Sequence, residues 1–167
     1  MRLFEFVMKD GEKVYPDAKL PVYMTKQSAG ADFYCAEEVV VPPAKVVKIS
    51  EGDIEEFALD AKPTLVHTGI CCRLLESDCL ELFNRSGNPK AGLVLANGVG
   101  VVDADYYNNE SNGGEIMFAF YNFSKKPVKI DVGQRIGQGV IHSYHKVDNA
   151  IVVDNDRSGA FGSTGVM

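Results

Sequence analysis

The sequence has no long apolar run. No stretch approaches the roughly 20 consecutive apolar residues that a membrane-spanning helix needs. The first residues, MRLFEFVMKDGEKVY, carry too many charges and too short an apolar segment for a secretory signal. We therefore expect no membrane association and a cytoplasmic location.

Metal-binding and disulfide patterns are also missing. The four cysteines form no C-x-x-C pair and two are adjacent, which suits neither zinc nor a disulfide framework, so we expect free, buried thiols. They are Cys35, Cys71, Cys72 and Cys79. The three histidines form no H-x-x-x-H pair and no Ser-His-Asp cue, and we interpret them as ordinary strand residues. They are His67, His142 and His145.

Basic charge is scarce. There are 17 Lys and Arg residues against 23 Asp and Glu, and the formal net charge is −6. A broad nucleic-acid surface needs a basic face, so direct nucleic-acid binding is not expected. An anionic ligand would need a local pocket.

What the sequence does contain is a series of short β-branched and aromatic runs between glycines and prolines. Residues 51–63 alone place Ile54, Phe57, Ala58 and Ala61 at helical spacing, with acidic residues in front, so we expect one short helix or an acidic loop there. The 167 residues otherwise predict one all-β domain, a barrel or sandwich with at most one or two short helices.

The chain is organised around NGVGVVDADYY, residues 97–107. One apolar run enters this stretch and another leaves it, so its polar residues are expected at the mouth of a hairpin. In strand alternation Asp103 shares a face with Val101 and Asp105, opposite Val102, and is partly sheltered. Such a carboxylate either holds a water as a general base or is a solvated turn residue.

FNRSGNPKAG is a second polar cluster. Arg85 offers a fixed fork of donors, Ser86 a hydroxyl and Gly87 a backbone N–H, a combination that suits phosphate oxygens. An ordinary surface turn with a salt-bridged arginine has the same pattern.

DVGQRIGQGV is a third cluster. Strict alternation places Arg135, Gly137 and Gly139 on one face and Ile136 and Gln138 on the other. Arg135 either pairs with an acidic neighbour or contacts a ligand. Gln138, on an apolar face, needs hydrogen-bond partners.

The end of the chain, DRSGAFGSTGVM, is rich in glycine. It either wraps a phosphate chain, with Phe161 free to stack on a base, or is a frayed terminus. Asp32, in AGAD, is either a turn residue or a participant in a metal site.

Five segments, in this order, resemble the motifs of the trimeric deoxyuridine triphosphate pyrophosphatases, the dUTPases. They are AGADF at 29–33, RSG at 85–87, NGVGVVDADY at 97–106, GQRIGQ at 133–138 and RSGAFGSTG at 157–165. The resemblance implies a dUTPase-like β-barrel or jelly roll of mostly antiparallel strands over residues 1–156. It also implies a flexible glycine-rich arm, residues 157–167, that closes over an active site.

The resemblance assigns a role to each matching residue. Asp103 would orient the attacking water and hydrogen-bond the deoxyribose 3′-hydroxyl, and Tyr106 would lie against the sugar and leave no room for a 2′-hydroxyl. The uracil edge would be met by Asn97, Gly100, Val101, Ile116 and Met117. The phosphates would be held by Arg85, Ser86, Gly87 and Gln138. The arm, from a neighbouring subunit, would add Arg157, Phe161, Ser163 and Thr164.

The implied activity is hydrolysis of dUTP to dUMP and pyrophosphate by a homotrimer with shared sites. Mg²⁺ would arrive with the substrate's phosphates, and Asp32 would touch it through water. Such an activity belongs to nucleotide metabolism and keeps uracil out of DNA.

Three features depart from the family pattern, and one of them, the insertion at 51–63, resembles a longer variant associated with bacteria and phages. A longer loop, residues 107–113, follows Tyr106; Ala160 stands where the arm usually has glycine; and residues 51–63 are an insertion. Two other functions stay open. A dCTP deaminase of the same fold would need a glutamate motif after the RSG cluster, which is missing. A regulatory nucleotide-binding protein would act through a protein partner, and the insertions would serve that role.

Overall fold

The structure is a computed structural model that describes residues 1–51 and 54–151, and their side chains except those of residues 49–58. Within these ranges it contains fifteen strands, two short 3₁₀ turns and no α-helix. The strands are β1 (Leu3–Phe6), β2 (Met8–Lys9), β3 (Glu12–Lys13), β4 (Ala31–Tyr34), β5 (Val39–Val41), β6 (Lys45–Glu51), β7 (Ile54–Asp60), β8 (Thr64–His67), β9 (Ile70–Arg73), β10 (Asp78–Asn84), β11 (Leu93–Leu95), β12 (Gly100–Asp103), β13 (Met117–Asn122), β14 (Val128–Ile130) and β15 (Arg135–Ser143). The turns are η1 (Asn88–Ala91) and η2 (Ala104–Tyr106). The prediction of an all-β fold of short strands is confirmed.

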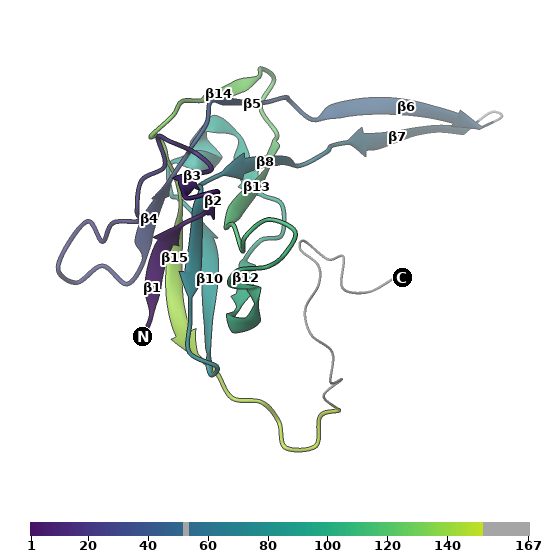
Figure 1. The fold of residues 1–167 in the computed structure, drawn as a ribbon. Coiled ribbons are helices and arrows are strands. Elements are labelled where there is room, and N and C mark those ends of the chain that lie inside the picture. The colour runs from purple at the N-terminus through teal and green to yellow at the C-terminus, as the bar shows by residue number, and fades with distance from the viewer. Residues whose placement is uncertain (52–53, 152–167) are drawn as a thin grey trace.

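The strands pair antiparallel in small sheets (Figure 1). The largest has the order β12-β10-β15-β4, and a three-stranded sheet has the order β11-β13-β8. The remaining described strands form two-stranded pairs: β1 with β9, β14 with β5, β2 with β3, and β6 with β7. Most neighbours are distant in sequence, so pairing brings the predicted motifs together.

Both larger sheets contribute to one hydrophobic core, which is centred on phenylalanines. Phe33 of β4 packs against Phe118 of β13 with ring centroids 5.6 Å apart, and Phe118 stacks on Phe120 at 6.3 Å. All three side chains are fully buried. A Cβ on Gly137 would lie 2.0 Å from the Phe118 ring, so only glycine allows β15 to approach this closely.

Strand β15 is not a regular strand, which corrects the predicted alternation of its side chains. Its register with β4 shifts between Arg135 and Gly137, because a β-bulge inserts Ile136. Ile136 is 1 % exposed and lies in the core, as Gly137 does. Arg135 and Gln138 therefore both lie beside Asp32 of β4, although strict alternation had separated them.

Residues 51–63 contain no helix in their described part, so that prediction is wrong. Strand β7 pairs with β6 along its whole length, from Lys45 opposite Asp60 to Glu51 opposite Ile54. The apolar spacing in 54–61 fits a helix. The β-branched run before it, in β6, offers a strand partner instead, and the periodicity of a single segment contains no information about such a partner. The hairpin extends away from the other strands (Figure 1). Val46 and Leu59 face each other across it and are 70 % and 57 % exposed.

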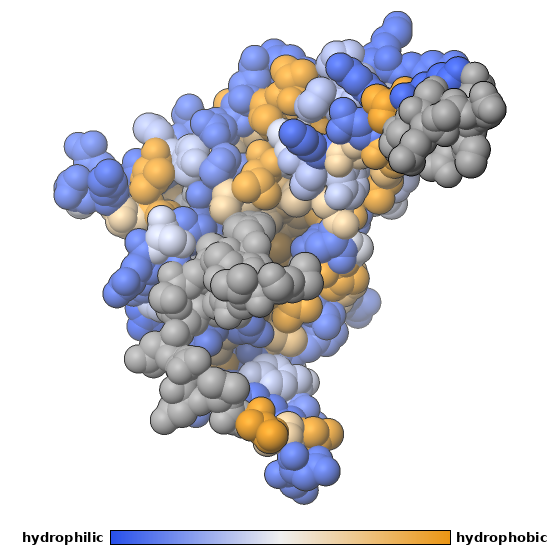
Figure 2. Space-filling model, turned by 90° about the vertical axis from the view of Figure 1, so that its right-hand side faces the viewer, coloured by the Kyte–Doolittle hydropathy of each residue, from blue (hydrophilic) through white to orange (hydrophobic). Residues whose placement is uncertain are grey.

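Elsewhere the exposed apolar residues are scattered. On the side toward which the hairpin points, hydrophilic residues dominate the described surface and the apolar ones form small separate groups (Figure 2). None of the described helical segments is long or apolar enough to cross a membrane.

Candidate active site

Asp32 is the centre of a charged cluster at one corner of the four-stranded sheet. The residue lies on β4 and is only 6 % exposed. Its Oδ2 accepts a 2.9 Å hydrogen bond from Nη1 of Arg135, and its Oδ1 lies 4.0 Å from Nε of Arg85. Of the two alternatives for Arg135, pairing with an acidic neighbour is the observed one.

The RSG segment begins where β10 ends and lies against β15. Arg85 donates from Nη1 to the carbonyl of Arg135 at 3.2 Å. Asn88 was missed by the sequence analysis: its side-chain amide donates to Asn84 Oδ1 and to the Ile136 carbonyl, both at 2.7 Å. Ser86 and Gly87 are held exposed by these contacts. Open space surrounds the position of a Cβ on Gly87, which suits an approaching anion.

Gln138 completes this corner. It is half-buried and lies opposite Asp32 in the register of β15 and β4. A Cβ on Gly30 would lie 3.0 Å from Gln138 Oε1, so the glycine of AGAD leaves room for this amide. Around Asp32 the structure therefore gathers donors that could bind phosphate, namely Arg85, Gln138 and the exposed RSG backbone.

Asp103 lies elsewhere, at the end of β12. Val101 is 59 % exposed, Val102 is 9 % exposed and Asp103 is half-buried, which confirms the predicted alternation up to this residue. The strand ends here, however, and Ala104–Tyr106 form the 3₁₀ turn η2, so the alternation does not extend to Asp105. Asp103 opens into a surface cavity of about 540 Å³ whose other lining residues are Leu74, Glu76, Ala104, Asp105, Tyr144 and Lys146.

The stretch around residues 97–107 connects two strands that pair as the predicted hairpin does, but it also contains a strand of the other sheet. Strand β11 pairs with β13, as predicted, but β12 pairs with β10 of the other sheet, so this passage crosses between sheets. Asn97 is exposed at the crossing, and its Nδ2 would lie 3.1 Å from a Cβ on Gly100. The amide of Ala96 donates to the carbonyl of Ala119 at 2.8 Å, which brings Asn97 alongside β13.

The residues expected to meet the sugar and the uracil are largely buried. Tyr106 is 6 % exposed, Ile116 1 % and Met117 9 %. The amide of Ile116 donates to the Ile70 carbonyl at 2.8 Å and its carbonyl accepts from Thr68 Oγ1 at 2.5 Å. The single N–H of Ile116 is therefore used within the chain, which argues against its pairing with a base.

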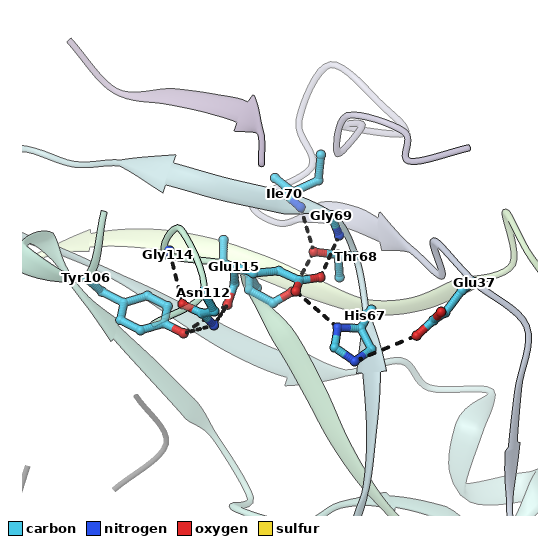
Figure 3. Close-up of polar contacts among 10 residues, drawn as sticks. Glu37, His67, Thr68, Gly69, Ile70, Tyr106, Asn112, Gly114 and Glu115 are labelled. Carbon is cyan, nitrogen blue, oxygen red and sulfur yellow. Dashed lines mark hydrogen bonds and ion pairs between the residues drawn. The ribbon is translucent and has the colours of Figure 1, made fainter. Parts of the chain in front are cut away.

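Glu115 and His67 form a polar contact that the sequence analysis missed (Figure 3). Glu115 is 5 % exposed; its Oε2 lies 3.1 Å from Nδ1 of His67, and its Oε1 accepts from the Gly69 amide at 2.9 Å. The other ring nitrogen of His67 lies 3.7 Å from Glu37. His67 is thus more than an ordinary strand residue. Strand periodicity carries no signal for a contact 48 residues apart.

The described residues suit magnesium as an ion that a ligand carries. No group of three or more metal-ligating side chains occurs among the described residues. Oδ2 of Asp32 accepts its hydrogen bond from Arg135. Oδ1 lies 4.0 Å from Nε of Arg85, which is too long for a hydrogen bond. Oδ1 can therefore accept a hydrogen bond from a metal-bound water.

The cysteines match their prediction. All four are free and buried. Burial raises the pKa of the Cys72 thiol to about 12 and that of Cys35 to about 11, so neither is a ready nucleophile.

Two halves of the expected site lie far apart within one chain. Asp103 is paired with Cys79 at the start of β10, whereas Arg85 follows its last residue. At about 3.3 Å per strand residue, the two side chains are separated by roughly 20 Å along β10. The expected arm residues lie outside the described residues. They are Arg157, Phe161, Ser163 and Thr164.

The fold and these two groups define an all-β protein with a charged corner around Asp32 and a distant cavity lined by Asp103. A family model described as dUTPase matches residues 54–165. A deoxyuridine 5′-triphosphate nucleotidohydrolase of Lactococcus lactis subsp. lactis is 35 % identical over 169 residues, covering 99 % of this chain and 98 % of the relative. The chain therefore belongs to the dUTPase family.

Solved structures agree with this assignment. The crystal structure of dUTPase from Streptococcus mutans matches with a TM-score of 0.68 and 32 % identity, over 87 % of this chain and 98 % of that one. A mutant dUTPase from phage phi11 of S. aureus, described as coordinating a structural Mg(II) ion, has the same fold. Its TM-score is 0.62 and its identity 17 %, over 91 % of this chain and 96 % of that chain.

Proposed function

We propose that this protein hydrolyses dUTP to dUMP and pyrophosphate in an assembly in which each site combines residues of different copies. Family membership supports the reaction. The shared site is supported by the distance between Asp103 and Arg85, which are separated by roughly 20 Å along β10. A nucleotide that needs both groups close together requires a second copy.

The surface between the two halves also favours such an assembly. Leu80 and Leu82 of β10 point into the core, so Glu81 and Val101 opposite it face outward. Val101 is 59 % exposed, and Val99 just before β12 is 42 % exposed. Covering these apolar side chains would stabilise contact between copies. A homotrimer is the arrangement that the family resemblance implies.

In the proposed reaction the Asp103 carboxylate orients a water molecule and accepts its proton. The water oxygen forms a bond to the α-phosphorus, the bond from that phosphorus to the bridging oxygen breaks, and pyrophosphate leaves. Arg85, the RSG backbone, Gln138 and the expected Arg157 hold the phosphates. Mg²⁺ would be held by the phosphates and, through water, by Asp32, and it would neutralise charge on the leaving group.

The remaining assignments come from the resemblance. Tyr106 lies against the deoxyribose, Asn97 and the backbone of Gly100, Val101 and Met117 surround the uracil, and Phe161, Ser163 and Thr164 close the site from the arm, residues 157–167. The four unpaired thiols suit a reducing cytoplasm. The deaminase alternative is not favoured, because the family and the relatives are nucleotidohydrolases. No observation supports a regulatory partner.

The reaction is tested by measuring pyrophosphate release from dUTP, dCTP, dTTP and UTP with Mg²⁺. We expect turnover of dUTP alone. Asp103→Asn should keep nucleotide binding and lose on the order of a thousandfold or more in kcat. Near wild-type turnover of this variant would remove Asp103 from the mechanism.

The shared site is tested by mixing two inactive variants. Asp103→Asn and Arg85→Ala chains, unfolded and refolded together, should regain part of the activity, because some sites then combine an intact Asp103 with an intact Arg85. Each variant refolded alone is the control. A mixture that stays as inactive as the separate variants would place the whole site in one chain.

A further inference from the structure

The loop between Tyr106 and Glu115, longer than the family hairpin, is tied together by its own asparagines. Asn109 is 5 % exposed, and its Oδ1 accepts from the Ser111 amide at 2.9 Å. The Gly113 amide donates to the Asn109 carbonyl at 2.7 Å. These bonds give the inserted residues a defined shape.

Asn112 connects this loop to Tyr106 (Figure 3). Its Nδ2 donates to the Tyr106 hydroxyl at 2.8 Å, and its Oδ1 accepts from the Gly114 amide at 3.1 Å. The Tyr106 hydroxyl in turn donates to the Glu115 carbonyl at 3.1 Å. One amide thus connects both ends of the loop through the phenol.

The Glu115 carbonyl is itself firmly placed. The Glu115 carboxylate accepts from the Gly69 amide at 2.9 Å and contacts His67 at 3.1 Å, while Thr68 holds the next residue, Ile116, at 2.5 Å. The Tyr106 hydroxyl therefore has partners of different origin. Glu115 is fixed by the body of the protein, and Asn112 comes from the longer loop.

The position of Tyr106 matters for the reaction because it ends η2, whose N-cap is Asp103. The Tyr106 ring is held at its hydroxyl and at its backbone, so it is a rigid surface three residues from Asp103, the expected catalytic carboxylate. Removing one hydroxyl partner would let the ring adjust to a larger sugar.

We propose that Asn112 is a positioning residue for sugar selection, which holds the Tyr106 ring where a ribose 2′-hydroxyl would collide with it. This assignment rests on the proposed function, since it gives a chain-specific means for the choice of deoxyribose. Asn112 acts through Tyr106 and does not touch the nucleotide.

The test compares kcat/KM for dUTP and UTP in wild type and Asn112→Ala. We expect the dUTP-to-UTP ratio to fall about tenfold, the size of one lost hydrogen bond to a buried hydroxyl. Tyr106→Phe removes the same bond from the other side and leaves the contact between Asn112 and Gly114 in place. Because Tyr106→Phe also removes the bond to the Glu115 carbonyl, the double variant should lower the ratio no further than Tyr106→Phe alone.

Glu110→Gln is the matched control, because Glu110 is exposed in the same loop and should leave the ratio unchanged. If kcat/KM in Asn112→Ala falls equally for dUTP and UTP, or for neither, the ratio is unchanged. Asn112 then has only a structural role and the assignment is overturned. Additive effects with Tyr106→Phe would overturn the route through Tyr106. A wild-type protein that releases no pyrophosphate from dUTP would instead overturn the proposed function and this assignment with it.

Discussion

Asp32 and Arg135 lie 103 residues apart in the sequence, and their side chains meet at 2.9 Å across strands β4 and β15. The bulge at Ile136 makes this contact, because it turns Arg135 toward Asp32 beside Gln138. The ion pair leaves Arg85, at 4.0 Å from Asp32, less strongly bound to the carboxylate. In the proposed function this weaker contact would leave Arg85 available for phosphate.

Replacing Arg135 by methionine should affect both stability and substrate binding. Asp32 is 6 % exposed, so loss of its closest cation is expected to cost about 1–2 kcal/mol of unfolding free energy, reduced because Arg135 is 40 % exposed. Arg85 should move toward Asp32 and the KM for dUTP should rise. Urea unfolding and steady-state kinetics measure the two effects; Lys129→Met, in an exposed ion pair with Glu38, is the control and should change neither.

Gly137→Ala should destabilise the core strongly. The added Cβ would lie 2.0 Å from the buried Phe118 ring, and overpacking of this kind is expected to cost about 2 kcal/mol or more. Thermal unfolding measures the loss. Gly87→Ala provides the contrast, because nothing lies within 4 Å of its Cβ and its stability should stay close to wild type. Equal midpoints for the two variants would contradict the close approach of β15 to Phe118.

Acid should weaken the fold through Asp78. Nε of Arg2 donates to this carboxylate at 2.5 Å and Ser143 at 2.9 Å, and the Arg2 hydrogen bond is the main cause that lowers the pKa of Asp78 to about 2. In the unfolded chain an aspartate has a pKa of about 3.9, so the contribution is complete above about pH 4 and is lost as the pH falls toward about 2.

Asp78→Asn should accordingly lower stability at neutral pH and flatten the decline between about pH 4 and about pH 2. Circular dichroism during urea unfolding at several pH values follows this. Asp131→Asn, at an exposed carboxylate, should keep the wild-type profile. An unchanged decline in Asp78→Asn would show that other carboxylates govern the acid limb.

The β6–β7 hairpin should be dispensable for folding. Its strands pair only with each other among the described strands, and it extends away from them (Figure 1). Joining Lys45 to Asp60 by two glycines should therefore leave the thermal midpoint and pyrophosphate release close to wild type. If this shortened chain unfolds without cooperativity, the hairpin belongs to the core.

Local patterns predicted much of this protein correctly. The β-branched runs predicted an all-β fold, the adjacent Cys71 and Cys72 predicted free thiols, and the alternation of Val101 and Val102 predicted a half-buried Asp103. Local periodicity was wrong for residues 51–63, where the deciding partner is the strand Lys45–Glu51. It was also wrong beyond Arg135, because one inserted residue reverses every face after it.

By itself, the amino-acid order determined the fold class, the family and the chemical groups of the proposed site. Only the tertiary structure decided which of these groups meet: it joined Asp32 to Arg135, set Asn112 on Tyr106, and separated Asp103 from Arg85 by the length of β10. The physical reason is that antiparallel strands pair with partners far away in sequence. Their register depends on hydrogen bonds and packing of the whole core, which no short window of residues contains.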